Sequence, residues 1–126
     1  RQKSINLSDL RHLPFIMTAA GATAHVEKLF EAAGLHLNVQ HRYSQILTII
    51  KTVESGAGVS IVASLALSDQ VMAMCPGAVK KPLAQPARRS VGLAVPNLKQ
   101  ASPAVLAFLK TAKALVPKLR QDLALR

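Results

Sequence analysis

The sequence has few aromatic residues and almost no cysteine. Its 126 residues include one cysteine, no tryptophan, three phenylalanines and one tyrosine. A single Cys75 cannot form an internal disulfide, which favours a reducing compartment. Phe15, Phe30 and Phe108 all fall at predicted core positions, so Tyr43 is the one aromatic ring left to stack on a base. The scarcity of aromatic residues therefore disfavours a binder of single-stranded nucleic acid.

Long hydrophobic runs are also lacking. No stretch approaches the roughly 20 apolar residues that a membrane helix needs, and the polar opening Arg1-Gln2-Lys3-Ser4 has nothing of a signal peptide. We expect a cytoplasmic protein with no membrane partner. The length and the 50% hydrophobic content fit one compact domain. The chain begins without Met, and we expect that it was cut from a longer protein.

Acidic residues are scarce too: six Asp and Glu stand against sixteen Lys and Arg, for a net charge of +10. Residues 64–126 hold ten of the sixteen basic residues and only two acids, so this half carries +8. Clustered cations attract DNA or an anionic ligand. They also make an ordinary solvated face. The composition leaves both interpretations open.

What the chain does have is a strand–bend–helix pattern that occurs twice. Phe15-Ile16-Met17 reads as a short strand and leads into the Ser/Thr/Gly-type bend of residues 18–23. A helix pattern follows from Ala24, with Thr23 placed to cap it and Gly34 to end it. The alternation over 37–43 predicts the next strand.

The second strand–bend–helix unit continues the alternation of strands and helices. A helix pattern covers residues 46–53, with Ser44 as a plausible cap and Gly56 as the stop. Val59–Ala63 then reads as an interior strand of a parallel sheet, apolar on both faces apart from Ser60. Strands that alternate with helices predict an α/β fold: an open, mainly parallel sheet flanked by helices. Ligands of such sheets bind at the carboxyl ends of the strands, here at residues 18–23, at residues 43–45 and from Ser64 onward.

The remainder is less periodic. Residues 64–71 predict a short capped helix, and residues 78–83 and 91–95 predict two strands. Ser102-Pro103 opens a final helix with an apolar stripe, which Pro117 is expected to kink or end. The stripe comprises Val105, Leu109, Ala112 and Val116, widened by Leu106 and Phe108.

The bend at residues 18–23 is a candidate anion site. A bend between a strand and a helix leaves N–H groups of the first helical turn unpaired, and small residues let an anion such as a carboxylate approach them. The start of the next helix, at Tyr43, Ser44 and Gln45, is a second candidate. Thr23 and Ser44 are also expected simply to cap their helices, which is compatible with a ligand.

Signals for catalysis, metals or cofactors do not assemble. His12, His25, His36 and His41 lack metal-ligand spacing, and we expect no metal site. Gly56 and Gly58 follow a helix and precede a strand, the wrong order for a dinucleotide loop. No nucleophile with its base and no carboxylate pair can be assembled, so we expect neither an enzyme nor a bound cofactor.

Five segments in order resemble a known family. They are Leu7–Leu10, Leu13–Ile16, Leu29–Gly34, Val53–Val62 and Ser102–Leu109. Their order and spacing resemble the effector-binding region of bacterial LysR-type transcriptional regulators. The resemblance implies a periplasmic-binding-protein-like lobe, with residues 1–90 as the second lobe and residues 91–126 as a return strand and helix toward a first lobe that is missing here.

The resemblance also implies a function. A small-molecule effector would bind between the lobes, and the bend at residues 18–23 suits a small organic anion. The residues at the positions where the family contacts its effector are Thr18, Ala19, Gly21 and Thr23. The helix at 24–33 and the strand at 38–42 would lie at an antiparallel dimer contact. Promoter DNA would be bound only through a helix-turn-helix domain that this chain lacks. Without the first lobe the final helix needs another partner, so we predict self-association of this fragment or a repacked helix.

The alternative interpretation is a lobe of a periplasmic-type solute-binding protein, which shares the fold. The reading frame upstream of Arg1 separates the two, since a regulator carries a helix-turn-helix there and a solute-binding protein carries a hydrophobic leader.

Overall fold

The structure is a computed structural model that describes residues 2–124, with side chains described for residues 2–121. It divides into two compact units, residues 2–89 and 90–124. The first unit contains α1 (Leu7–Leu10), β1 (Phe15–Thr18), α2 (Thr23–Ala32), β2 (Val39–Tyr43), α3 (Ile46–Glu54), the 3-10 helix η1 (Ser64–Ala66) and α4 (Asp69–Ala73). The second contains the 3-10 helix η2 (Leu98–Gln100) and α5 (Pro103–Ala124).

The sheet of the first unit is parallel, as predicted. β1 pairs with β2 in a register that places Phe15 opposite Val39 and Thr18 opposite Tyr43. On the other side of β1, Phe15 forms a parallel bridge with Val59. The described sheet contains two strands, and the four residues of β1 are buried on both faces. The crossover through α2 therefore brings two successive strands side by side in the same direction.

The prediction of an interior strand at Val59–Ala63 is wrong. Val59 exchanges backbone hydrogen bonds with Pro14 and Ile16, at 2.9 and 2.8 Å, but the ladder then stops. The Ser60 hydroxyl, at 2.7 Å, donates to the Ile16 carbonyl, an acceptor that a continued ladder would use. Residues 59–62 are half-buried and Ala63 is exposed. The segment has one strand neighbour, β1, which is the central element of the sheet.

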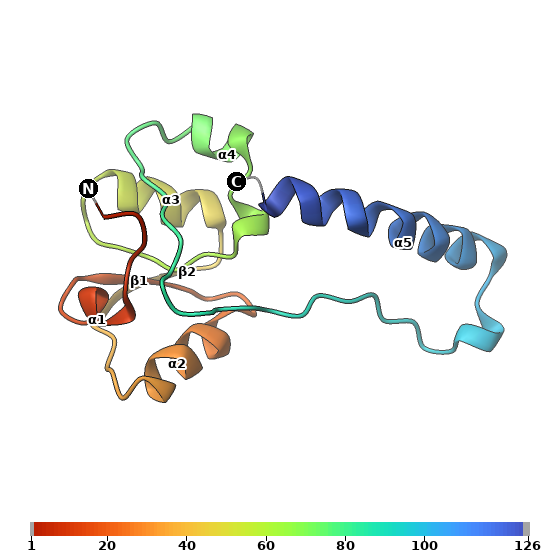
Figure 1. Ribbon diagram of the computed structural model, residues 1–126, viewed down its shortest axis with the longest axis horizontal. Helices are drawn as coiled ribbons and strands as arrows, with labels where there is room; N and C mark the ends of the chain where they lie inside the picture. The colour runs from red at the N-terminus through yellow and green to blue at the C-terminus, as the bar shows by residue number, and fades with distance from the viewer. Residues whose placement is uncertain (1, 125–126) are drawn as a thin grey trace. The chain divides into compact units, whose positions relative to one another are not determined.

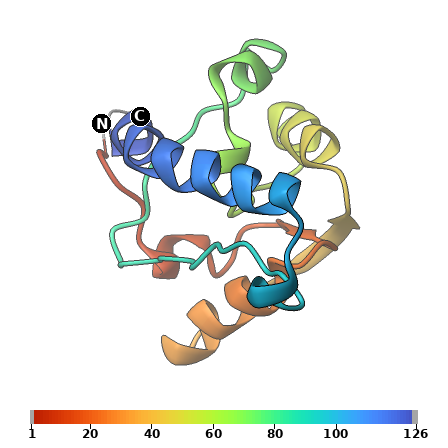
Figure 2. The same ribbon diagram turned by 90° about the vertical axis from the view of Figure 1, so that its right-hand side faces the viewer.

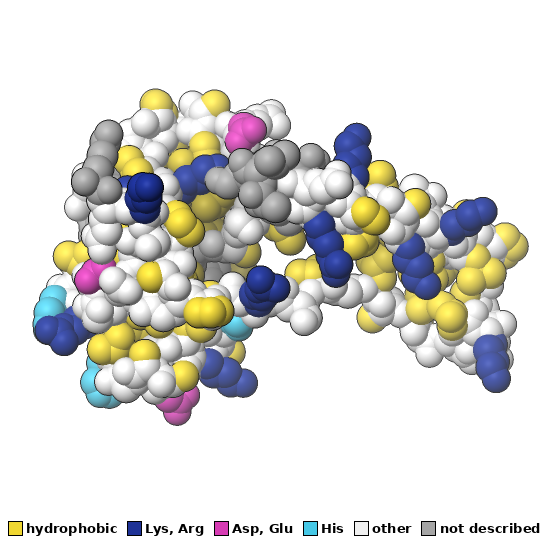
Figure 3. Space-filling model, viewed as in Figure 1, with side chains coloured by type: hydrophobic (Ala, Val, Ile, Leu, Met, Phe, Trp, Pro, Cys, Tyr) yellow, Lys and Arg dark blue, Asp and Glu magenta, His cyan; other side chains and the backbone are white. Residues whose placement is uncertain are grey.

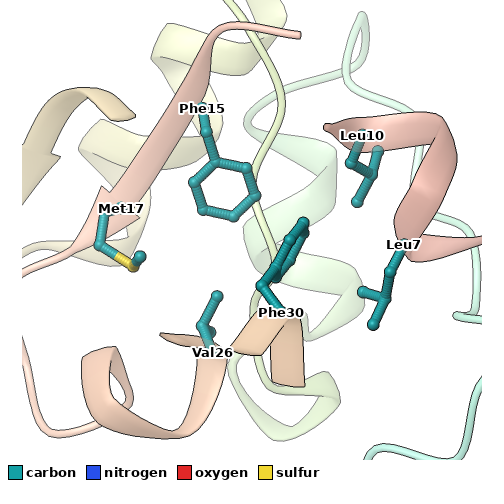
Figure 4. Packing of buried hydrophobic residues seen from close by; sticks show 6 residues of the cluster. All are labelled: Leu7, Leu10, Phe15, Met17, Val26 and Phe30. Atoms are coloured by element: carbon teal, nitrogen blue, oxygen red, sulfur yellow. The ribbon is translucent and has the colours of Figure 1, made fainter. Parts of the chain in front are cut away.

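Helices cover both faces of the sheet. α1 and α2 lie on one side, and α3 and α4 lie on the other (Figures 1 and 2). A cluster on the α2 side contains the two buried phenylalanines, whose ring centroids are 5.9 Å apart in an edge-to-face arrangement. Figure 4 shows its six members: Leu7, Leu10, Phe15, Met17, Val26 and Phe30. Ile16 points to the opposite face of the sheet and is fully buried. Ile49 of α3 is also fully buried, and Ile50 is 5% exposed.

The helix ends match the sequence at the C-terminus and differ at the N-terminus. Gly34 and Gly56 follow α2 and α3 with φ angles of 65° and 81°, the left-handed conformation that favours glycine. The predicted caps are wrong: α2 already includes Thr23, and its N-cap is Ala22. The N-cap of α3 is Gln45 rather than Ser44, and no side chain caps that helix. Thr23 has a different role because its hydroxyl turns back to the preceding bend.

Residues 64–83 also differ from expectation. The predicted helix at 64–71 is two short pieces, η1 and α4, and Ser68 caps the second by accepting from the Val71 amide. Residues 78–83 are not a strand. Their backbone pairing with the N-terminal segment is one parallel bridge between Ile5 and Leu83, where the Ile5 amide donates to the Pro82 carbonyl at 3.0 Å. Pro82 has no N–H to extend a ladder.

In the second unit, residues 91–95 are extended but form no strand, because no described segment pairs with them. Ser102 immediately precedes α5 and caps it as predicted, with its hydroxyl accepting from the Val105 amide at 3.4 Å. Pro117 does not end the helix, which continues to Ala124. The predicted core position of Phe108 is wrong, since its side chain is 63% exposed. Val105, Leu109 and Ala112 are half-buried, while Val116 is 41% exposed.

Candidate functional site

The two candidate loops lie at the same edge of the sheet. Thr18 and Tyr43 are opposite each other at the carboxyl ends of β1 and β2. One residue further on, the Ala19 amide donates to the Tyr43 carbonyl at 2.7 Å. The parallel register thus brings residues 18–23 next to the start of α3, which is the position where open parallel sheets bind ligands.

The bend at residues 18–23 is held in shape by two threonines. The Thr18 side chain is buried, at 6% exposed, and its hydroxyl oxygen accepts from the Ala20 amide at 3.2 Å. The Thr23 hydroxyl donates to the Thr18 carbonyl and lies 3.1 Å from the Ala20 carbonyl. The hydroxyls therefore bond within the bend and organise it.

Three backbone N–H groups of this bend remain available. Among the described residues, the amides of Gly21, Ala22 and Ala24 have no hydrogen-bond acceptor. They belong to the turn that leads into α2 and to its first residues. Gly21 and Ala24 are exposed and Ala22 is half-exposed, so a ligand in solution has access to these donors. Unpaired amides at a helix start carry partial positive charge and suit an anion.

Arg89 adds a full positive charge beside the bend. Its Nη2 lies 3.9 Å from the position that a β-carbon on Gly21 would take. Sequence reasoning counted Arg89 only as part of a diffuse basic half. The two residues are 68 positions apart in the chain, and no local pattern connects them. The positive charge of Arg89 was the one sequence feature that could have pointed to a role in anion binding.

The second candidate segment is built differently. The Tyr43 ring stacks on the His41 ring, with centroids 6.0 Å apart and planes at 12°. Ser44 is exposed and makes no hydrogen bond within the described residues. Gln45 lines a broad, open depression on the surface of α3 with Leu47, Thr48, Lys51, Thr52 and Ser55. The structure therefore brings Tyr43 to the bend through its backbone, while Gln45 faces another surface feature.

One charged cluster ties α3 to the loop after α4. The Glu54 carboxylate accepts from Lys51 Nζ at 2.7 Å and from the Gly77 amide at 2.9 Å. The hydrogen bond from Lys51, with that from Gly77, holds the pKa of Glu54 below its ordinary value. The same bond to Glu54 raises the pKa of Lys51. This arrangement is a structural tie between two elements.

Basic side chains also line the second unit. Lys110, Lys113, Lys118 and Arg120 all belong to α5, and Figure 3 shows lysine and arginine side chains along this helix. Within residues 2–124 no three His, Cys, Asp or Glu side chains are grouped as metal ligands. No helix in the described part of the chain has the length and apolar character needed to span a membrane.

Comparison with known proteins identifies the class to which this parallel α/β lobe belongs. Residues 1–117 match the family model described as LysR substrate binding domain. The chain is also 33% identical over 112 residues to the uncharacterized HTH-type transcriptional regulator YvbU of Bacillus subtilis (strain 168). The alignment covers 89% of this chain and 38% of that relative. The chain belongs to the LysR substrate-binding domain family, the effector-binding module of LysR-type regulators. These matches do not favour the solute-binding-protein alternative.

Proposed function

We propose that this domain senses a small organic anion at the bend of residues 18–23, with Arg89 as its counter-charge. The observation that carries the proposal is the convergence of three unpaired amides with a guanidinium at the carboxyl edge of a parallel sheet. A carboxylate accepts bonds from several donors at once, and charged hydrogen bonds are stronger than neutral ones.

The residues of the bend have distinct parts in this proposal. Gly21 supplies an amide and, lacking a side chain, leaves room for the Arg89 guanidinium. Ala19 fixes the bend to β2, and Thr18 and Thr23 hold its shape through their hydroxyls. Tyr43 and Ser44 would form the neighbouring wall, with the Ser44 hydroxyl free to reach a ligand, while Gln45 lies at the depression on α3.

The wider activity follows from the family. The domain would be part of a longer cytoplasmic bacterial regulator, in which an upstream helix-turn-helix domain binds the promoter. Effector binding would favour one arrangement of the lobes over another and so change the geometry of a DNA-bound dimer. α2 and β2 would contribute the dimer contact. The Glu27 and Arg42 side chains, 3.7 Å apart, already link these two elements within one chain.

The test is a thermal-shift screen of the full-length protein against small carboxylates, repeated with Thr18→Val. We expect at least one carboxylate to raise the unfolding temperature, since a ligand that binds the native state stabilises it. The shift should fall in Thr18→Val, because that change removes the acceptor for the Ala20 amide. A shift that survives undiminished would place the pocket elsewhere.

A further inference from the structure

A second hollow lies on the opposite face of the sheet from the α1–α2 cluster. It is half open to solvent, is bordered by α3, by the chain after Val59, by α4 and by residues 78–81, and has a volume of about 110 Å³. Nothing in the proposed effector site uses it, because the bend at residues 18–23 contributes no residue to its lining.

The lining of this hollow is apolar at its base and basic at its rim. Ile49 and Ile50 are buried at its base, four apolar side chains of α3, α4 and the chain between them are half-buried around it, and Val79 at its edge is 74% exposed. These surrounding side chains are Val53, Val62, Leu67 and Met72. The Ser60 hydroxyl is already bonded to the Ile16 carbonyl, so it offers its hydrogen to no ligand. An apolar hollow of this size accommodates a branched or cyclic hydrocarbon group.

The rim supplies the charge. Lys80 and Lys81 border the hollow, and Lys80 makes no hydrogen bond or ion pair within the described residues. The Lys81 ammonium donates to the Gln2 carbonyl. The Glu54 carboxylate, next to Val53 in α3, is already bonded to Lys51 and Gly77. It is therefore not a partner of the two lysines at the rim. The free ammonium favours an anionic head group.

We propose that this hollow is a second ligand site, for a small carboxylate with a branched or cyclic hydrocarbon tail. The tail would lie against Ile49, Leu67 and Met72, and the carboxylate would meet Lys80 at the rim. The site is separate from the anion site at residues 18–23 and does not depend on it.

The three methionines provide the readout. Met72 lines the hollow, Met17 is buried on the other face of the sheet beside Thr18, and Met74 is 47% exposed outside the lining. The full chain, labelled with ¹³C at the methionine methyls, would be titrated with isovalerate. We expect the Met72 signal to move with saturation in the millimolar range, while the Met17 and Met74 signals stay in place.

Two analogues of isovalerate, one without its charge and one without its apolar tail, and two variants of the chain complete the design. Isovaleramide, which lacks the charge, and Lys80→Met should each weaken binding about two- to fivefold, the range of an exposed ion pair. Succinate, which lacks an apolar tail, should leave Met72 unmoved. Ala78→Leu places a larger side chain in the lining and should abolish the response without loss of the fold, which the unchanged Met17 signal would verify.

Three outcomes would overturn the proposal. The first is no shift of Met72 with isovalerate in the folded protein. The second is a shift of Met17 without Met72, which would place the ligand at the residue 18–23 bend. The third is a Met72 shift that depends on protein concentration alone, which would make the hollow a contact between two copies of the chain.

Discussion

The Gly77 amide donates a hydrogen bond of 2.9 Å to the Glu54 carboxylate, and so connects the loop after α4 to the end of α3. The pKa of Glu54 is lowered in the folded chain from its ordinary value of 4.5, first by Lys51 and then by Gly77. A group with a lowered folded pKa stabilises the native state above its unfolded pKa, and that contribution disappears as the pH falls through the folded pKa.

We therefore expect the Gly77 tie to be intact at neutral pH and to weaken below about pH 4.5, the unfolded value. Two-dimensional NMR of the Gly77 amide against pH measures this. Glu54→Gln removes the charge, and its Gly77 signal should show no transition in that range. A transition that persists in Glu54→Gln would assign it to another group.

Replacing Arg89 tests the counter-charge of the anion site. Arg89→Gln should weaken binding of whichever carboxylate the screen identifies by about tenfold, the loss of one charged hydrogen bond. Arg88→Gln is the matched control, since it makes the same change one residue away and no atom of Arg88 lies within 4 Å of the β-carbon position of Gly21. Isothermal titration of the full-length protein measures both. Equal effects of the two changes would indicate that the carboxylate is attracted by the general positive charge of this region instead of by a specific contact with Arg89.

Thr18→Val tests the shape of the bend. The change keeps the size of a buried side chain and removes the acceptor for the Ala20 amide, so we expect a loss of stability of about 1 kcal/mol and a weaker ligand response. Thr52→Val is its control, because Thr52 bonds to the Thr48 carbonyl on the surface of α3. Urea unfolding measures the stability of each. The control should leave the ligand response unchanged.

Gly58 is required by close packing against Pro14. A β-carbon at Gly58 would lie 2.3 Å from the Pro14 carbonyl oxygen, too close for any side chain. Gly58→Ala should destabilise the chain by about 2 kcal/mol or more, because the Val59 to Pro14 hydrogen bond must shift. Gly92→Ala, with no atom within 4 Å, should change stability by less than about 0.5 kcal/mol. Similar unfolding midpoints for the two would contradict the steric argument.

The exposed apolar side chains of α5 predict self-association of this chain. Phe108 is 63% exposed and Leu106 46% exposed, and large exposed apolar groups favour burial against a partner. Sedimentation equilibrium should show dimers or larger species whose population falls in Phe108→Lys. Lys110→Ala, also on α5, should leave the distribution unchanged. A monomer at all concentrations would contradict the prediction.

The sequence by itself determined the local elements and their direction. The apolar spacing in residues 15–33 and 39–53 sets the strand and helix periods, and Gly34 and Gly56 end both helices because a left-handed backbone is easiest for glycine. Alternation of strand and helix then leaves little choice but a parallel sheet with the bends at one edge.

Only the tertiary structure decided which strand is central and what each polar side chain does. The Ser60 hydroxyl, in place of a backbone amide, donates to the Ile16 carbonyl and ends the ladder there. The Thr23 hydroxyl bonds back to the bend instead of capping α2. Arg89 reaches Gly21 only through the return of the chain from a distant segment. Such pairings depend on distances in space between residues far apart in sequence, and periodicity carries information only about near neighbours.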